Sequence, residues 1–326
     1  MLAIVNFHYI RNNFNAKYSS IFGLTPKQFE NQILELAKWG TFISQRDLKA
    51  AVKNQIPLPD KAILLTFDDG LAEQYNFALP ILKALKVPAV FFINSQILVQ
   101  AKILNVHKIH LLRSTMEPRF FLEKLLGFIK KENIEIDTQQ AALIGKAHYK
   151  NDNEIGSHTK YLLNFSISIL HQNHFIESLF SETFQNKEEN IFHQLYMTQE
   201  QIKNLASLGY IGSHGHNHLP IALLNKEERH FQLSTSKKIL QDVTGKEIYG
   251  FSFPYGAYEA CNISAESMRL AGYEYGVTLE RLINHNVHTP HHLARMDCVD
   301  APTGKNHKFS NNNLFENFSS PKWKFN

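Results

Sequence analysis

Apolar residues along the chain occur in short continuous runs that are separated by amphipathic stretches. Residues 2–7, 61–67 and 89–93 are almost entirely apolar, a pattern that favours strands buried on both faces. Residues 72–86 instead have the apolar spacing of a helix. A strand, a helix and a strand in succession form a βαβ unit, so we expect parallel strands with right-handed crossovers.

Capping signals mark further elements. Thr25 followed by Pro26 is typical of a helix start, with Thr as the N-cap and Pro at the first helical position. Thr198 is the expected N-cap of a later helix. From residue 280 onward the pattern is that of a histidine-rich loop. The predicted helices are 26–39, 44–53, 198–208, 224–244 and 264–271, and the later predicted strands are 209–213, 248–253 and 273–278.

Residues 97–195 differ in composition from the rest of the chain. They are rich in Lys, Asn, Gln and Phe, contain few glycines, and show mostly helical spacing. We therefore expect a mostly helical insertion at 97–195. It interrupts an α/β barrel or sheet built from residues 1–96 and 196–310, and residues 311–326 form a polar C-terminal tail.

Composition and charge are those of an ordinary globular protein. The 326 residues are 44% hydrophobic and 20% charged, enough for one large domain with an insertion or for two domains. The formal net charge of +4 is small and dispersed, so it indicates neither a nucleic acid nor an anionic membrane as partner. Cys261 and Cys298 provide neither a disulfide framework nor the spacing of a cysteine metal site.

The N-terminal residues predict no targeting segment. Met1 to Tyr9 is apolar for only a few residues and has no basic region and no small-residue cleavage site, so no signal peptide is predicted. We also expect no transmembrane helix, because no stretch of about 18 apolar residues occurs. A cytoplasmic location is the resulting expectation.

Two adjacent carboxylates, Asp68 and Asp69, directly follow the apolar run 61–67. Neighbouring aspartates repel each other and resist burial, and proteins tolerate them mainly where a cation or a proton transfer requires both. Enzymes built on parallel strands keep their sites at the carboxyl ends of those strands. The pair is therefore a candidate for catalysis or metal binding.

Two histidines four residues apart, His214 and His218, could complete a metal site. On a helical turn this spacing puts both imidazoles on one face. A carboxylate with two histidines is a recurring binding set for Zn²⁺, Fe²⁺ or Co²⁺. His216 falls off that face, so we expect it behind the ligands or on the surface. A solvated turn with three histidines is the alternative, and the Asp68-Asp69 pair argues against it.

A third stretch, Phe253–Gly256, closes a predicted strand with Pro-Tyr-Gly. Such a turn can point a backbone N–H inward, the kind of donor that an oxyanion needs, although Pro-Tyr-Gly is more often only a turn. Taken in order, Thr66–Gly70, His214–His218 and Phe253–Gly256 resemble the first three motifs of the polysaccharide deacetylases, the NodB-homology or carbohydrate esterase 4 superfamily. The opening strand into His8-Tyr9, and Arg295, resemble its PgaB-like branch.

The resemblance implies a distorted (β/α) barrel with seven strands. It also implies one bound divalent metal, for which zinc is the first expectation and cobalt, iron or nickel are alternatives. It also implies a role for each matching residue. Asp68 would be the general base, and Asp69, His214 and His218 would bind the metal. The backbone N–H of Tyr255 would help to bind the oxyanion.

The chain departs from the family pattern beside the general base. Many members have an arginine that orients this base, and here that position is Ser252. We therefore expect Arg295 to pair with Asp68 instead.

The general acid has no match either, because the Leu-x-Leu-His motif of many members is missing. The candidates by location are His285, His288, His291 and His292. His8 is an additional active-site candidate because it ends the first strand.

The predicted activity is that of a hydrolase acting on the amide bond of N-acetyl groups, with an N-acetylated carbohydrate in a glycan or glycoconjugate precursor as substrate. Two alternatives stay open: an amidohydrolase of non-sugar C–N bonds that uses the same site, and a non-catalytic glycan-binding relative. The sequence leaves the oligomeric state open.

Overall fold

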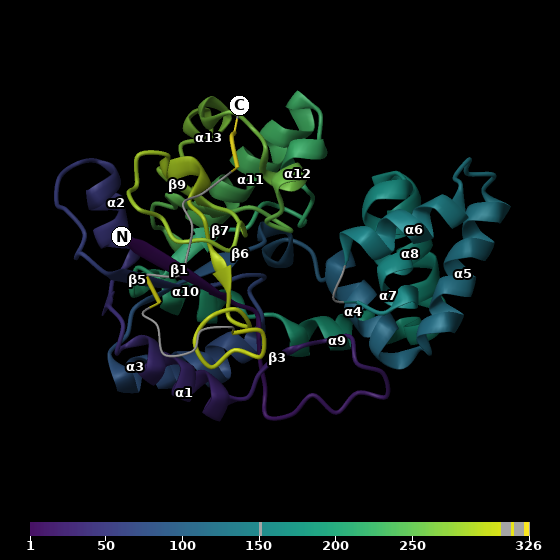
Figure 1. The fold of residues 1–326 in the computed structure, drawn as a ribbon, viewed down its shortest axis with the longest axis horizontal. Coiled ribbons are helices and arrows are strands. Elements are labelled where there is room, and N and C mark those ends of the chain that lie inside the picture. The colour runs from purple at the N-terminus through teal and green to yellow at the C-terminus, as the bar shows by residue number, and fades with distance from the viewer. Residues whose placement is uncertain (150–151, 308–313, 316–322, 326) are drawn as a thin grey trace. The chain divides into compact units, whose positions relative to one another are not determined.

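The computed structural model describes residues 1–149, 152–307, 314–315 and 323–325. The chain divides into two compact units, whose elements are labelled in Figure 1. Residues 14–22 group with the helices of the insertion, a link that the sequence did not suggest. Most of the predicted tail at 311–326 lies outside the described residues. The first unit comprises residues 1–13, 23–102 and 192–326, and the second comprises residues 14–22 and 103–191.

A β-sheet forms the centre of the first unit. Its strands run in the order β10-β1-β5-β6-β7-β8-β9, and β4 lies beside the start of β5. The pairings are parallel, as the βαβ pattern predicts. The strands are β1 (Leu2–Phe7), β4 (Thr41–Phe42), β5 (Ala62–Phe67), β6 (Ala89–Ile93), β7 (Ile211–Ser213), β8 (Gly250–Ser252), β9 (Tyr275–Val277) and β10 (Met296–Asp297).

The two ends of the sheet curl toward one segment of the chain. Leu293 pairs with Val277 of β9, and three residues later Met296 pairs with Val5 of β1. With its surrounding helices, this is the distorted (β/α) barrel, with seven strands in its path, that the resemblance implied. The sequence predicted only loop after residue 280, because β10 is two residues long and too short to show a pattern.

Helices of the first unit begin where their capping signals predicted. The Thr25 side chain accepts a hydrogen bond from the Gln28 N–H at the start of α1, and Thr198 caps α10 in the same way. The predicted helix at 72–86 is helical from residue 72 and contains a π-helix, Gln74–Ala78, followed by α3. The helices are α1 (Pro26–Leu36), α2 (Gln45–Val52), α3 (Leu79–Leu85), α10 (Gln199–Ser207), α11 (Lys226–Thr244), α12 (Tyr258–Cys261) and α13 (Ala265–Leu270), and β2 (Tyr9–Ile10) pairs with β3 (Gly23–Leu24) in a separate sheet.

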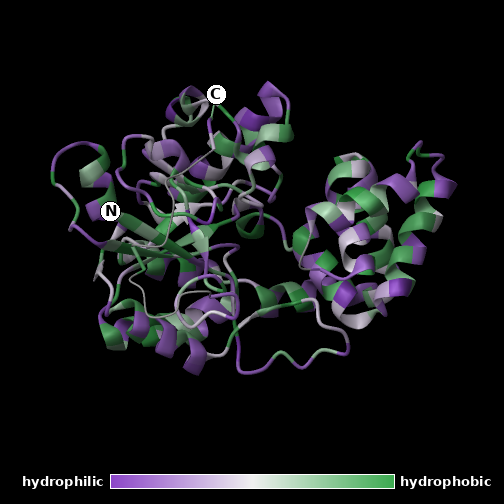
Figure 2. Ribbon diagram, viewed as in Figure 1, coloured by the Kyte–Doolittle hydropathy of each residue, from purple (hydrophilic) through white to green (hydrophobic). Residues whose placement is uncertain are grey.

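Stacked phenylalanines anchor the strand that leads into the two aspartates. Phe67, the last residue of β5, stacks on Phe91 with 4.6 Å between ring centroids and on Phe7 at 5.3 Å. Phe29 of α1 meets Phe7 edge to face at 5.0 Å. Each fully buried ring contributes about 1.5–3 kcal/mol to stability by leaving water. Figure 2 shows the sheet as mostly hydrophobic, whereas the helices alternate between polar and apolar residues. The two aspartates therefore directly follow a strand end that aromatic packing holds in place.

The second unit is helical and contains a fully buried lysine. Lys108 donates to both carboxylate oxygens of Glu177, at 2.7 and 2.6 Å, and lies 2.9 Å from Glu188. The two carboxylates offset the cost of burying its charge.

No helix within the described ranges is long and apolar enough to cross a membrane. The helices are α4 (Asn105–Thr115), α5 (Pro118–Lys131), α6 (Thr138–His148), α7 (Glu154–Tyr161), the π-helix Leu162–Ser166 and α8 (Ile169–Phe184), and α9 (Glu188–Leu195) leads back into the first unit.

Candidate active site

The residues that the sequence singled out gather at the carboxyl ends of the strands. Asp68 and Asp69 follow β5, His214 follows β7, and Tyr255 lies just beyond β8. Arg295 is the exception, because it lies at the amino end of the two-residue strand β10 and reaches Asp68 with its long side chain. Because parallel strands of a barrel end on the same side, residues that are far apart in the sequence meet there.

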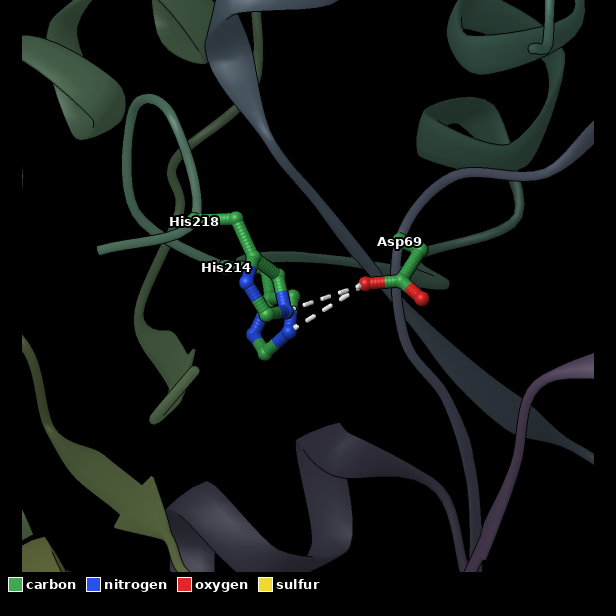
Figure 3. Close-up of side chains that lie close together, drawn as sticks. All are labelled: Asp69, His214 and His218. Carbon is green, nitrogen blue, oxygen red and sulfur yellow. Dashed lines mark ion pairs between the residues drawn. The ribbon is translucent and has the colours of Figure 1, made fainter. Parts of the chain in front are cut away.

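Asp69, His214 and His218 form a buried cluster whose candidate ligand atoms all lie within 4.8 Å of one another. The Nε2 atoms of both histidines are 3.5 Å from the same Asp69 oxygen, Oδ1. Figure 3 shows the two imidazoles facing this oxygen. Ligand atoms arranged tetrahedrally around zinc at about 2.0–2.2 Å are themselves about 3.3–3.6 Å apart. The two separations of 3.5 Å from Asp69 Oδ1 therefore fit ligands of a single metal ion.

His214 is oriented by a backbone carbonyl. Its Nδ1 lies 2.7 Å from the carbonyl oxygen of Ser252, an acceptor, so Nδ1 carries a proton and Nε2 is the nitrogen that would offer its lone pair to a metal. Two acceptors 3.5 Å apart repel each other unless a cation or a proton lies between them. Burial lowers the pKa of His214, but the carboxylates of Asp68 and Asp69 outweigh burial and raise it. Both the donor set and its charge fit a divalent metal such as zinc.

The stretch His214–His218 is a loop and not the helical turn that the sequence analysis assumed. The φ of His218 is 61°, in the left-handed region. Gln232 of α11 accepts hydrogen bonds from two successive N–H groups of the loop, the first of them that of His216 at 3.1 Å. The His216 ring is buried, and its Nδ1 lies 2.8 Å from the Ser95 hydroxyl. This buried support, rather than helical periodicity, brings the two imidazoles together.

Asp68 forms a bidentate ion pair with Arg295, the partner that the sequence analysis expected. Nη1 donates to Oδ1 at 2.9 Å and Nη2 donates to Oδ2 at 2.7 Å. Burial by itself raises the pKa of Asp68, but the guanidinium of Arg295 and the nearby His214 outweigh burial and bring the pKa down to about 2. Asp68 is therefore ionised at neutral pH.

Asn6 of β1 supports this ion pair, although it was not among the site residues predicted from the sequence. Its Oδ1 accepts from Arg295 Nη1 at 2.9 Å, and its Nδ2 donates to Asp68 Oδ2 at 3.2 Å. Arg295 Nη1 also lies 3.3 Å from the hydroxyl of Thr66. A polar residue inside the apolar run 2–7 was the signal that could have revealed Asn6, because buried polar side chains need partners.

The ion pair predicts how stability depends on pH. The pKa of Asp68 is about 2 in the folded protein and 3.8 ordinarily. Its contribution of about 2 kcal/mol to the free energy of unfolding is therefore complete above pH ~4 and lost as the pH falls toward ~2. Denaturant unfolding with a chelator present should show the stability difference between wild type and Asp68→Asn shrinking by this amount across that range. A difference that stays constant with pH would contradict the pKa shift.

Tyr255 reaches the metal cluster through its ring. The centroids of the Tyr255 and His218 rings are 4.9 Å apart, a contact that the sequence did not predict. Tyr255 and Gly256 both have left-handed φ values, 64° and 67°. A Cβ on Gly256 would come within 2.5 Å of the Leu279 Cβ, so only glycine fits there. The oxyanion role of the Tyr255 N–H stays a prediction.

His8 lies next to Asp68 at the carboxyl end of β1. Its Nε2 is 3.9 Å from Asp68 Oδ2, and its side chain is 35% exposed. Its Nδ1 is 3.5 Å from Asn6 Nδ2. His8 therefore lies near the buried carboxylate of Asp68 and is also accessible to solvent.

The four histidines proposed by location have other surroundings. His285 is exposed and directly follows Asn284, whose N–H donates to the Leu2 carbonyl at the amino end of β1, opposite Asp68. His288 is also exposed. The buried His291 lies 3.0 Å from the carbonyl of Tyr273, which precedes β9. These placements do not support an acid role.

His292, the last of the four, lies in an aromatic stack. Its ring is parallel to those of Phe253 and Phe325, with centroids 5.5 and 3.9 Å away. Burial lowers the pKa of His292 to about 4, so the ring is neutral at neutral pH. The stack indicates a packing role.

A profile of the family described as polysaccharide deacetylase matches residues 55–207 and 177–276. The two matches overlap and together cover more than half of the chain. The chain belongs to the polysaccharide deacetylase family. The matched range contains Asp68, Asp69, His214, His218 and Tyr255, whereas Arg295 and His8 lie outside it.

Curated proteins with this family name resemble part of the chain. A peptidoglycan deacetylase of Helicobacter pylori is 31% identical over 103 residues, which are 31% of this chain and 33% of that protein. The putative polysaccharide deacetylase YxkH of Bacillus subtilis is 30% identical over 93 residues, which are 28% of this chain and 33% of that protein. The chain thus matches about a third of the length of these relatives.

Solved structures share the fold over most of the chain. The Streptococcus pyogenes deacetylase PplD covers 91% of each chain with a TM-score of 0.52 and 15% identity. IcaB from Ammonifex degensii covers 90% of each with a TM-score of 0.51 and 18% identity. A de-N-acetylase from Aggregatibacter actinomycetemcomitans covers 91% of this chain and 95% of its own, with a TM-score of 0.53 and 16% identity.

Proposed function

We propose that this protein is a metal-dependent hydrolase that removes N-acetyl groups from amino sugars in a glycan or a glycoconjugate precursor. The observation that carries the proposal is the convergence of two histidine Nε2 atoms on one oxygen of Asp69, at 3.5 Å each, beside the ionised Asp68. A metal-binding cluster next to a separate carboxylate supplies the electrophilic and the proton-accepting groups that amide hydrolysis needs.

In this proposal Asp69 Oδ1 and the Nε2 atoms of His214 and His218 hold the metal. A divalent ion such as zinc bound there would polarise the amide carbonyl and lower the pKa of water toward ~7. The three side chains are almost fully buried, which keeps bulk water away and strengthens electrostatic interactions within the site.

Asp68 is proposed to accept the proton of the attacking water. With a pKa of about 2 it is a weak base, since a base works best with a pKa near the working pH. Asp68 therefore orients the water and holds its proton only briefly before passing it on. The two hydrogen bonds from Arg295 keep the carboxylate in one orientation throughout.

His8 is proposed to give the leaving amine its proton. It lies 3.9 Å from Asp68 Oδ2 and is partly exposed, so it can face the base on one side and a bound substrate on the other. The backbone N–H of Tyr255 is proposed to help hold the oxyanion, a contribution of about 3 kcal/mol for one such donor.

Acetate release from N-acetylglucosamine oligomers tests the proposal. We expect activity that a chelator removes and that zinc or cobalt restores, because the metal supplies the electrophile. Asp68→Asn should bind metal and lose about 10²- to 10⁴-fold in kcat, the usual contribution of a general base. Full activity in metal-free protein would refute the mechanism. Hydrolysis of ureides or imides without acetate release from sugars would instead favour a non-sugar amidohydrolase.

A further inference from the structure

We propose that Gln74 is a positioning residue that sets the separation between His8 and Asp68. Its side chain is fully buried. Its Nε2 donates to the carbonyl oxygen of His8 at 3.0 Å and to that of Asp68 at 2.6 Å. One amide thus ties together the main chains of the two residues that are proposed to move protons.

These two carbonyls lie where the β-ladder ends. The pairing of β1 with β5 stops at Phe7 and Phe67, and its last bond runs from the Asp68 N–H to the Phe7 carbonyl at 3.1 Å. The next residues leave the sheet in different directions, because Tyr9 pairs with β3 and Asp69 turns with a φ of 82°. Beyond this last backbone hydrogen bond, the side-chain amide of Gln74 links the two chain segments instead.

The orientation of this amide follows from its partners. Both partners are carbonyl oxygens, which only accept, so the NH₂ group of Gln74 must face them. Gln74 is the first residue of the π-helix Gln74–Ala78, a rare element that is frequent at functional sites. The wider turn starts at the residue whose side chain reaches both strand ends.

The separation that Gln74 controls is the 3.9 Å between His8 Nε2 and Asp68 Oδ2. Asp68 is held by Arg295 and Asn6 through its side chain, whereas the His8 side chain is 35% exposed. The tie between main chains is therefore the strong constraint on where His8 lies. This inference rests on the proposed roles of His8 and Asp68.

The control is Gln45, whose Nε2 makes the same kind of contacts at the amino end of β7 and whose Oε1 also accepts from the Tyr275 hydroxyl at 3.2 Å. It is 2% exposed, and its Nε2 donates to the carbonyls of Gly209 and of Ile211, the first residue of β7, the latter at 3.1 Å. Gln74→Met and Gln45→Met each remove one buried amide that bridges two backbone carbonyls. Both should lower Tm, and only Gln74→Met should affect catalysis.

The test compares kcat, KM and zinc affinity of the two variants, with an N-acetylglucosamine tetramer as substrate. We expect Gln74→Met to lower kcat by about 10- to 100-fold, the effect of misplacing a reacting group by about 1 Å, with KM and zinc affinity unchanged. Gln45→Met should retain wild-type kcat. If Gln74→Met does not fold, Gln74→Asn, which keeps the donors on a shorter arm, should show the same loss in kcat. Equal kcat in the Gln74 and Gln45 variants would overturn the inference.

A double-mutant cycle separates positioning from a general structural effect. In a His8→Gln background, Gln74→Met should cost less than about twofold in kcat, because the group it positions is already gone. Additive losses would overturn the inference. Crystal structures of wild type and Gln74→Met give a readout without activity: an unchanged distance between His8 Nε2 and Asp68 Oδ2 overturns the inference alone, whereas full activity of His8→Gln and Asp68→Asn overturns the proposed function.

Discussion

Asp69→Asn is expected to abolish metal binding while leaving the metal-free protein folded. Asn has the shape of Asp without its charge, and it tolerates the left-handed φ of 82° found at this position. The variant also removes a buried negative charge from beside Asp68. The ligand function is lost, so zinc affinity should fall by more than the about 100-fold that an outer partner costs, and acetate release should fall to background.

Thermal unfolding with and without zinc measures this directly. For wild type, zinc at 100 times its Kd should add about 2.7 kcal/mol to the free energy of unfolding, and Asp69→Asn should show no such gain. Asp242→Asn, a change at an exposed carboxylate that pairs with Lys238, should behave like wild type. Zinc stabilisation that persists in Asp69→Asn would exclude Asp69 as a ligand.

Arg295→Met should be among the most destabilising single changes in the first unit, at about 3–5 kcal/mol. It removes the bidentate guanidinium partner of Asp68, while Asp68 stays buried with 3% of its side chain exposed. An unpaired buried charge carries this cost. Burial then raises the pKa of Asp68 above its ordinary value, so the deficit should be largest at neutral pH and shrink as the pH falls through the new pKa.

Chemical denaturation over pH 3–8 checks the effect of Arg295→Met. The double variant Asp68→Asn/Arg295→Met should be more stable than Arg295→Met alone, because the unpaired charge is gone. The control is Arg269→Met, which breaks an exposed pair with Glu266 and should cost no more than about 1 kcal/mol. Equal losses in the two arginine variants, or a pH-independent deficit, would contradict the argument.

The sequence was informative wherever the signal is local. Continuous apolar runs predicted the parallel strands, because a strand covered on both faces needs apolar residues at every position. Thr25 and Thr198 predicted helix starts, because a cap acts on N–H groups within three residues. Asp68 and Asp69 stood out because adjacent carboxylates at a strand end have few structural uses. The motif that contains these aspartates, together with the motif His214–His218, also indicated the family.

Tertiary structure decided which side chains meet. Asp68 and Arg295 are 227 residues apart, and they pair because the segment around β10 joins β1 at the edge of the sheet. The contacts of Asn6 and Gln74 arise in the same way, since a buried amide shows its partners only once the strands are assembled. His292 was a candidate for the general acid by its location in the sequence, but in the structure it is part of an aromatic stack.

Short local motifs therefore indicate which chemical groups the site contains, but they do not indicate how those groups are arranged in space. Residue types and spacing determine which groups can bind a metal or move a proton, since these are properties of single side chains. The charge state of Asp68, the tautomer of His214 and the placing of His8 depend on burial and on partners from distant strands. Such long-range contacts exist only in the folded, curled sheet, and no local pattern encodes them.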